Sequence, residues 1–164
     1  MREENITFKP LSLRPHWMQF SINQLHWLVL CIIAFTIYSC FHFLFSIIFL
    51  YVAIAILLYL LYQVAYLARM EYIVTSDQII FLHGVFIHET DYMELYRVID
   101  YQQHRSLIQQ MSGLKTVIIY SGDRNTPVMQ IIGMKEEVDV VKEIRRRVEY
   151  NKQIKHIYEI TNRM

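Results

Sequence analysis

The sequence predicts an α+β membrane protein: a hairpin of two transmembrane helices, followed by a small β-barrel or β-sandwich that a C-terminal helix caps. Residues 25–67 contain no Lys, Arg, Asp or Glu and are long enough for two helical crossings of roughly 20 residues each. Short β-branched and aromatic runs, separated by turn residues, follow from Tyr72. From Met134 the apolar residues recur every three or four positions, which is the period of a helix.

Composition limits the classes of function. The formal net charge of +1 over 164 residues is too small for general nucleic-acid binding, so no nucleic-acid polymer is expected as a partner. Both cysteines, Cys31 and Cys40, lie inside the apolar run, where we expect small packing residues and neither a disulfide nor a metal site. The run begins too late and is too long for a cleaved signal peptide.

The chain begins with a polar stretch that we interpret as an extended cytoplasmic tail, residues 1–15. Pro10 and Pro15 restrict its backbone and disfavour a helix there. Residues 16–27 then mix aromatic and polar side chains, which fits either a separate interfacial helix or the polar end of the first crossing. Trp17 and Trp27 are candidate anchors at the membrane–water interface, where an amphipathic ring is favoured.

The hairpin is predicted over residues 16–69, with crossings at about 17–38 and 43–67 and a turn at 39–42. The turn carries no positive charge, whereas both flanks carry several. By the positive-inside rule, both termini are expected in the cytoplasm. Arg69 ends the second crossing and is a third candidate anchor at the interface.

The next unit is predicted over residues 70–150. Its strands are expected at 72–75, 78–83, 85–93, 98–104, 116–120 and 128–132, with a hairpin loop at 121–127 and a short helical turn within 106–112. Gly84 separates the second predicted strand from the third, and a positive φ is expected at this position. The amphipathic helix begins at Met134, and its acidic first turn complements the helix dipole. Residues 151–164 form a C-terminal extension without an assignment.

Several short motifs occur in a characteristic order. They are Tyr72-Ile73-Val74-Thr75, Gly84, the run from Met93 to Asp100, and the run from Ser106 to Gly113. In this order the chain resembles the bacterial PH domain family of small membrane proteins over about residues 17–149. The resemblance implies a PH-like barrel that follows a two-helix hairpin and lies at the cytoplasmic face of a bacterial inner membrane. Gln78 stands where that family often has Arg.

The residues of these motifs are expected to be structural. Gly84 and Gly113 mark turns, and Arg97 and Asp100 would form an ion pair or a hydrogen bond that closes a turn. The alternative is that Arg97 and Asp100 bind a ligand. The first predicted hairpin, residues 75–78, has no Lys or Arg. The phosphoinositide binding of eukaryotic PH domains is therefore not transferred to this chain.

The sequence contains no catalytic motif, so no catalytic, cofactor-binding or metal-binding residue is assigned and no enzyme is expected. His83 and His88 would supply only half of a metal site. The most suggestive feature is a basic cluster near the C-terminus, in which the candidates for membrane-surface or partner contacts are Arg145, Arg146, Arg147, Lys152 and Lys155. Its alternative interpretation is the ordinary charged face of a helix.

These observations predict a non-enzymatic, membrane-anchored module. Its expected partners are the lipid bilayer and either copies of itself or another membrane-associated protein. The alternative is an oligomerising membrane effector of the antiphage type, in which the β-barrel senses a small ligand such as a nucleotide and the hairpin disrupts the membrane.

Overall fold

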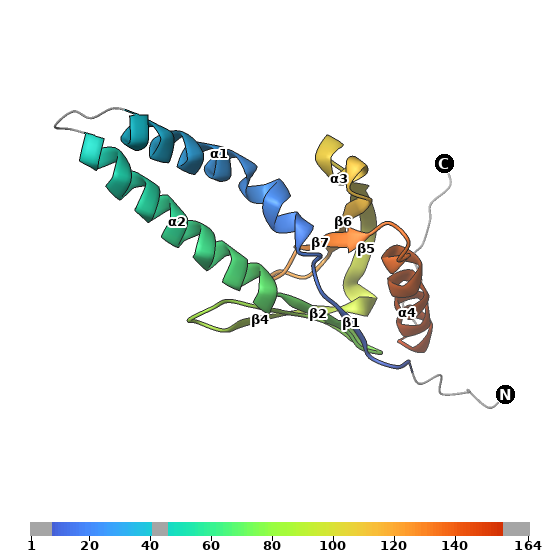
Figure 1. Ribbon diagram of the computed structural model, residues 1–164. Helices are drawn as coiled ribbons and strands as arrows, with labels where there is room; N and C mark the ends of the chain where they lie inside the picture. The colour runs from blue at the N-terminus through green and yellow to red at the C-terminus, as the bar shows by residue number, and fades with distance from the viewer. Residues whose placement is uncertain (1–7, 41–45, 156–164) are drawn as a thin grey trace.

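The computed structural model describes residues 8–40 and 46–155. The second half of the predicted turn at 39–42, the first seven residues of the tail and the end of the C-terminal extension lie outside this range. Within it, two long helices project from a unit made of two β-sheets and a C-terminal helix (Figure 1). The predicted α+β class is confirmed.

The hairpin consists of α1 (Met18–Cys40) and α2 (Ser46–Arg69), which run side by side in opposite directions (Figure 1). At about 1.5 Å per residue each helix is roughly 35 Å long, which exceeds the hydrocarbon core of a bilayer. By length and composition both helices are able to cross a membrane. Residues 18–27 continue α1 without a break, so the polar stretch is the end of this helix and not a separate interfacial helix.

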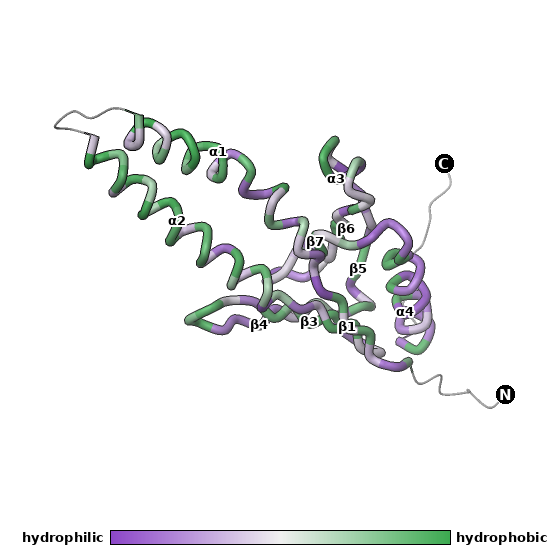
Figure 2. Tube along the Cα trace, in the orientation of Figure 1, coloured by the Kyte–Doolittle hydropathy of each residue, from purple (hydrophilic) through white to green (hydrophobic). Residues whose placement is uncertain are grey.

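The two helices pack along a narrow seam and expose most of their apolar surface. Small and aliphatic residues make the seam, namely Ala34, Ala53, Ile56 and Leu60. Nearer the sheets, the rings of Trp27 and Tyr59 lie 5.4 Å apart. Figure 2 shows the hairpin as mostly apolar, with polar segments chiefly on the part of α1 nearest the sandwich, whereas polar and apolar residues alternate in the rest of the chain. A helix that is apolar on all sides needs an apolar environment around it.

The β-unit is a sandwich of two antiparallel sheets that do not close into a barrel. One sheet has the order β1-β2-β3-β4 and the other the order β5-β6-β7. The strands of the first sheet are Leu11–Leu13, Glu71–Val74, Gln78–His83 and Glu89–Glu94. Those of the second are Val98–His104, Leu114–Ser121 and Val128–Lys135. The 3₁₀ helix η1 (Leu95–Arg97) joins the sheets, and the short helix α3 (Leu107–Met111) joins β5 to β6.

Strand β1 was not expected. Its three residues precede the hairpin, yet they pair with β2, which follows the hairpin. The Ser12 hydroxyl donates to the Glu71 carboxylate at 2.6 Å, and Arg14 pairs with the same carboxylate at 3.0 Å. These two bonds lower the pKa of Glu71. Part of the predicted tail therefore belongs to the sandwich.

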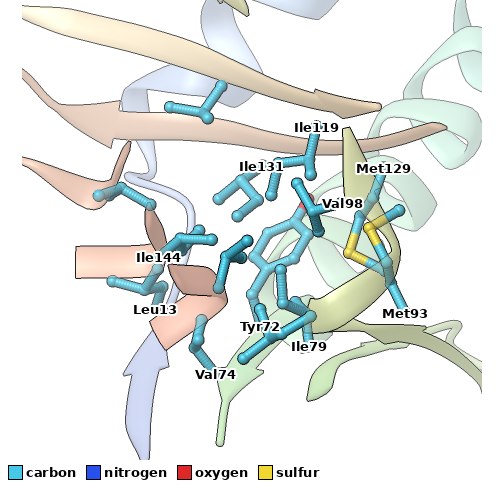
Figure 3. Packing of buried hydrophobic residues seen from close by; sticks show 14 of the residues in the cluster. Leu13, Tyr72, Val74, Ile79, Met93, Val98, Ile119, Met129, Ile131 and Ile144 are labelled. Atoms are coloured by element: carbon cyan, nitrogen blue, oxygen red, sulfur yellow. The ribbon is translucent and has the colours of Figure 1, made fainter. Parts of the chain in front are cut away.

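The core lies between the two sheets and is closed by α4 (Val140–Ile154), as Figure 3 shows from close by. The fully buried Tyr72, Ile79 and Ile119 come from three strands, and Val140 and Ile144 come from the helix. Burial raises the pKa of the Tyr72 hydroxyl well above its usual range. This alternation of buried and exposed residues is what the strand and helix periods require.

Two boundaries differ from the prediction. The third strand begins at Glu89 instead of residue 85, because residues 84–88 form the turn between β3 and β4. Gly84 has a φ of 106° there, as expected, and a Cβ at this position would clash with the carbonyl oxygen of Ile87. The C-terminal helix begins at Val140, because β7 continues through Lys135 and Asp139 caps the helix by accepting from Lys142 N at 3.1 Å.

Candidate functional site

The structure divides the predicted basic cluster. Arg147 is only 3% exposed and contacts the chain on several sides. It donates to the carbonyl oxygens of Val74 and Thr75, to that of Lys9 at 2.9 Å, and to the Glu143 carboxylate at 3.0 Å. The prediction that Arg147 makes a surface contact is wrong, because its buried guanidinium donates its hydrogen bonds to acceptors within the chain.

Arg145 and Arg146 lie on the outer surface of α4 and Lys155 caps its end, and all three lie beside the domain's own aromatic rings. The Arg145 guanidinium lies 5.6 Å from the centre of the Tyr101 ring, and that of Arg146 lies 5.5 Å from the Phe8 ring. Lys155 Nζ is 3.6 Å from the centre of the Tyr96 ring. Lys152 is half-buried. Because α4 lies at the end of the molecule away from the hairpin (Figure 1), these cations are placed better for a protein partner than for the membrane surface, and that role stays a prediction.

The motif residues Arg97 and Asp100 do not pair with each other. Arg97 Nε is 2.9 Å from the Glu94 carboxylate and 3.0 Å from the Tyr96 hydroxyl. Its Nη1 is 3.7 Å from the Asp123 carboxylate. Asp100 Oδ1 instead accepts from the backbone N–H of Tyr101 at 2.7 Å. Arg97 therefore joins η1 to the loop between β6 and β7. Gly113, with a φ of 62°, completes the turn after α3.

An open groove of about 460 Å³ lies beside Arg97, between the β3–β4 hairpin and the β6–β7 loop. Its charged lining residues are Asp91, Glu94, Arg97 and Asp123. The lining carries more negative than positive charge, so it suits hydrogen bonding to a neutral or cationic group better than binding to a phosphate. No cluster of three metal-ligating side chains occurs among the described residues.

The base of α1 is fixed to the second sheet by a buried polar network. The Gln109 side-chain amide donates to Gln19 Oε1 and to Thr116 Oγ1, both at 3.0 Å. The backbone N–H of His16 donates to the carbonyl of Gly133 at 2.9 Å. Sequence reasoning missed this contact, because no local pattern pairs a glutamine of the first helix with one 90 residues later.

The base of α2 is fixed to the β3–β4 hairpin. The Tyr66 hydroxyl is 3.2 Å from His83 Nδ1, and Arg69 Nη1 is 3.1 Å from His88 Nε2. The predicted anchor Arg69 therefore contacts the sandwich. Both ends of the hairpin are thus held by the sandwich, each by a different sheet.

Two small apolar surfaces lie on the hairpin side of the sandwich, one on each flank of the hairpin (Figure 1). On α3, Leu107 is 79% exposed and Met111 is 89% exposed. At the β3–β4 turn, Phe86 is 85% exposed and Ile87 is 75% exposed. Neighbouring exposed apolar side chains of this kind often mark binding surfaces.

Comparison with protein families bears directly on this arrangement of a hairpin and a capped sandwich. A family model described as "Bacterial PH domain" matches residues 24–152, from within α1 to near the end of α4. The chain belongs to the bacterial PH domain family. The match confirms the resemblance found in the sequence. No curated protein and no solved structure matches the chain. Strand β1 precedes the matched range, so the first sheet includes a strand that lies outside the family match.

Proposed function

We propose that this bacterial PH domain protein is a non-enzymatic module that the hairpin anchors in the inner membrane. Its sandwich lies at the cytoplasmic face and assembles there with copies of itself or with a membrane-associated protein. The exposed apolar surfaces of α1 and α2 support the anchoring, because lipid can surround these side chains and remove them from water.

The observation that carries the assembly role is the apolar surface of α3. Gln109 holds this helix against Gln19, and the neighbouring residues of α1 are polar, including Asn23 and Gln24. The hydrocarbon core begins only above them, near Leu25. Leu107 and Met111 therefore lie at the height of polar helix residues, where a protein surface covers apolar side chains better than lipid does.

A first experiment compares the mass of the wild-type chain with that of a Leu107→Ser/Met111→Ser variant in nanodiscs, over a range of protein concentrations. We expect the wild type to exceed the mass of the 19.8 kDa monomer. The variant should need at least about tenfold more protein to reach the same assembly, since a central apolar contact typically contributes more than about 1 kcal/mol.

Ile99→Ser is the matched control, because Ile99 is an exposed apolar residue of β5 away from α3. It should leave the mass unchanged. Cross-linking in the native membrane identifies a different partner if one takes the place of a second copy. A monomer at every concentration that also cross-links to no protein would contradict the proposal.

The alternative function, a membrane effector that senses a nucleotide, has less support. The groove beside Arg97 carries Asp91, Glu94 and Asp123, which would repel the phosphates of such a ligand. The direct contact between the sandwich and both ends of the hairpin would allow a ligand signal to reach the helices. A nucleotide that copurifies with the chain would restore this alternative.

A further inference from the structure

The turn between β3 and β4 presents two large apolar side chains at its tip. Phe86 and Ile87 are the most exposed part of this hairpin, and the polar residues His83 and His88 lie just behind them. Gly84 fixes the shape of the turn, because its φ of 106° is open to few residues with a side chain. The tip is thus a small, defined apolar projection.

This projection lies against α2. The rings of Phe86 and Tyr62 are nearly parallel, at 14°, with centres 6.1 Å apart. Behind the tip, the contacts of Tyr66 with His83 and of Arg69 with His88 fix the strands of the hairpin to the same helix. The turn therefore follows α2 away from the sandwich, as Figure 1 shows.

The position along α2 gives the height of the tip. Tyr62 precedes Arg69 by seven residues, which is about 10 Å at 1.5 Å per residue. Around Tyr62 the helix exposes Leu58, Leu61 and Val64. Across the hairpin, the Trp27 ring lies 5.4 Å from the Tyr59 ring, so the level of Leu25, where the hydrocarbon core begins on α1, lies near Tyr62 on α2. Phe86 consequently lies at the inner boundary of the core and not in the cytoplasm.

We propose that Phe86 and Ile87 insert into the cytoplasmic leaflet beside α2 and give the sandwich a membrane contact of its own. The chemistry of the projection fits lipid: apolar side chains at the tip meet acyl chains, and Arg69 and His88 lie at the height of the phosphates. Lipid is favoured over a second copy, because the tip continues an apolar helix surface that lipid already surrounds.

This proposal rests on the anchoring of α1 and α2 in the membrane. With the hairpin inserted, the inserted tip acts as a third point of support. The sandwich is then held at a fixed tilt against the bilayer, which would set the direction in which α3 faces its partner.

The test uses the full-length chain in nanodiscs of phosphatidylcholine and phosphatidylglycerol. Cys31 and Cys40 are replaced by alanine, and single cysteines at Phe86, Ile99 and Leu58 are labelled with a nitroxide. Collision of the label with oxygen, which concentrates in lipid, is compared with collision with a water-soluble nickel complex. Ile87→Cys is a second tip variant in case the Phe86 variant does not fold.

We expect the labels at residues 86 and 87 to favour oxygen, as the Leu58 label does, and the Ile99 label to favour nickel. Ile99 follows η1 at the opposite end of β4 and serves as the water-exposed control. Tip labels that behave like Ile99 while Leu58 reports lipid would overturn this proposal alone. A Leu58 label in water would instead contradict the membrane anchoring.

A third outcome separates lipid from protein. Tip labels that both reagents reach poorly, with spectra broadened by spin–spin coupling, would show that a second copy covers the turn, and lipid insertion would then be wrong. The outcomes are distinguishable because the single-label variants at Leu58, the tip and Ile99 are measured under the same conditions and compared on one scale.

Discussion

Arg147 joins three segments that are far apart in the sequence. Its guanidinium contacts the carbonyl of Lys9 ahead of β1, the carbonyls at the end of β2, and Glu143 one turn earlier in α4. Val74 is buried, so its carbonyl needs a donor from the protein. One side chain thus fixes the N-terminal segment, the first sheet and the cap relative to one another.

Replacing Arg147 should therefore destabilise the sandwich. We expect Arg147→Lys to lose about 1–3 kcal/mol, because a buried acceptor without a donor costs roughly that much and one ammonium cannot replace the fork of donors that reaches Val74, Lys9 and Glu143 together. Thermal unfolding of the detergent-solubilised chain measures the effect. Arg146→Lys is the matched control, and it should change stability by no more than about 0.5 kcal/mol, as exposed positions do. Equal effects of the two substitutions would contradict the role given to Arg147.

The burial of Arg147 could have been read from the helix period. It follows Ile144 by three residues and precedes Asn151 by four, and both are buried on the same face as Val148. Three arginines in succession indicate a charged surface. A helix, however, turns by about 100° per residue and cannot expose all three side chains equally. The acceptors of Arg147, in contrast, lie far away in the sequence and no local pattern predicts them.

At the scale of elements, the contact between α1 and β7 decides how firmly the hairpin is attached. Gly133 has a φ of 65°, and a Cβ there would lie 2.9 Å from Gln19 Cβ. Gly113 has almost the same backbone, with a φ of 62°, but no atom lies within 4 Å of the Cβ that it lacks. The two glycines therefore separate backbone strain from helix packing.

Gly113→Ala should lower the free energy of unfolding by about 1–2 kcal/mol, because a residue with a side chain is strained in a left-handed conformation. Gly133→Ala should cost at least about 1 kcal/mol more, because the methyl group must displace the first turn of α1. Hydrogen exchange at the amides of His16 and Gln19 measures this displacement. Faster exchange is expected for Gly133→Ala only, and the same rates in both variants would show that the contact is unimportant.

Elements with their own periodicity were predictable, and those defined by distant partners were not. The apolar helices, the β6–β7 hairpin and the amphipathic stripe of α4 are all visible in the sequence. Strand β1 has three residues and a partner 59 positions away, so its pattern alone is too short to identify. The sequence predicts Phe86 within a strand, because no local pattern places Gly84 to His88 in a turn beside α2, as the structure does.

At the scale of the whole molecule, the hairpin is an insertion within the sandwich. Residues 70–155 expressed alone should aggregate, because β2 becomes an exposed edge strand and Leu13 leaves the core. Joining residues 8–15 to residue 70 through a short Gly-Ser linker should restore a folded, soluble chain, since Leu13 and Tyr72 already lie opposite each other. Size-exclusion chromatography compares the two chains, and equal solubility of both would contradict the importance of β1.

The pairing of β1 with β2 also has a consequence for biosynthesis. The ribosome completes β1 before either helix of the hairpin, so this strand waits without a partner until both helices have left the exit tunnel. The sheet can form only when residues 11–13 and 72–74 arrive in the same compartment. With the hairpin anchored in the membrane as proposed, a chain in which one helix failed to insert would leave its two strands on opposite sides of the bilayer, without a sandwich. Completion of the first sheet is therefore a built-in check that the hairpin has the correct topology.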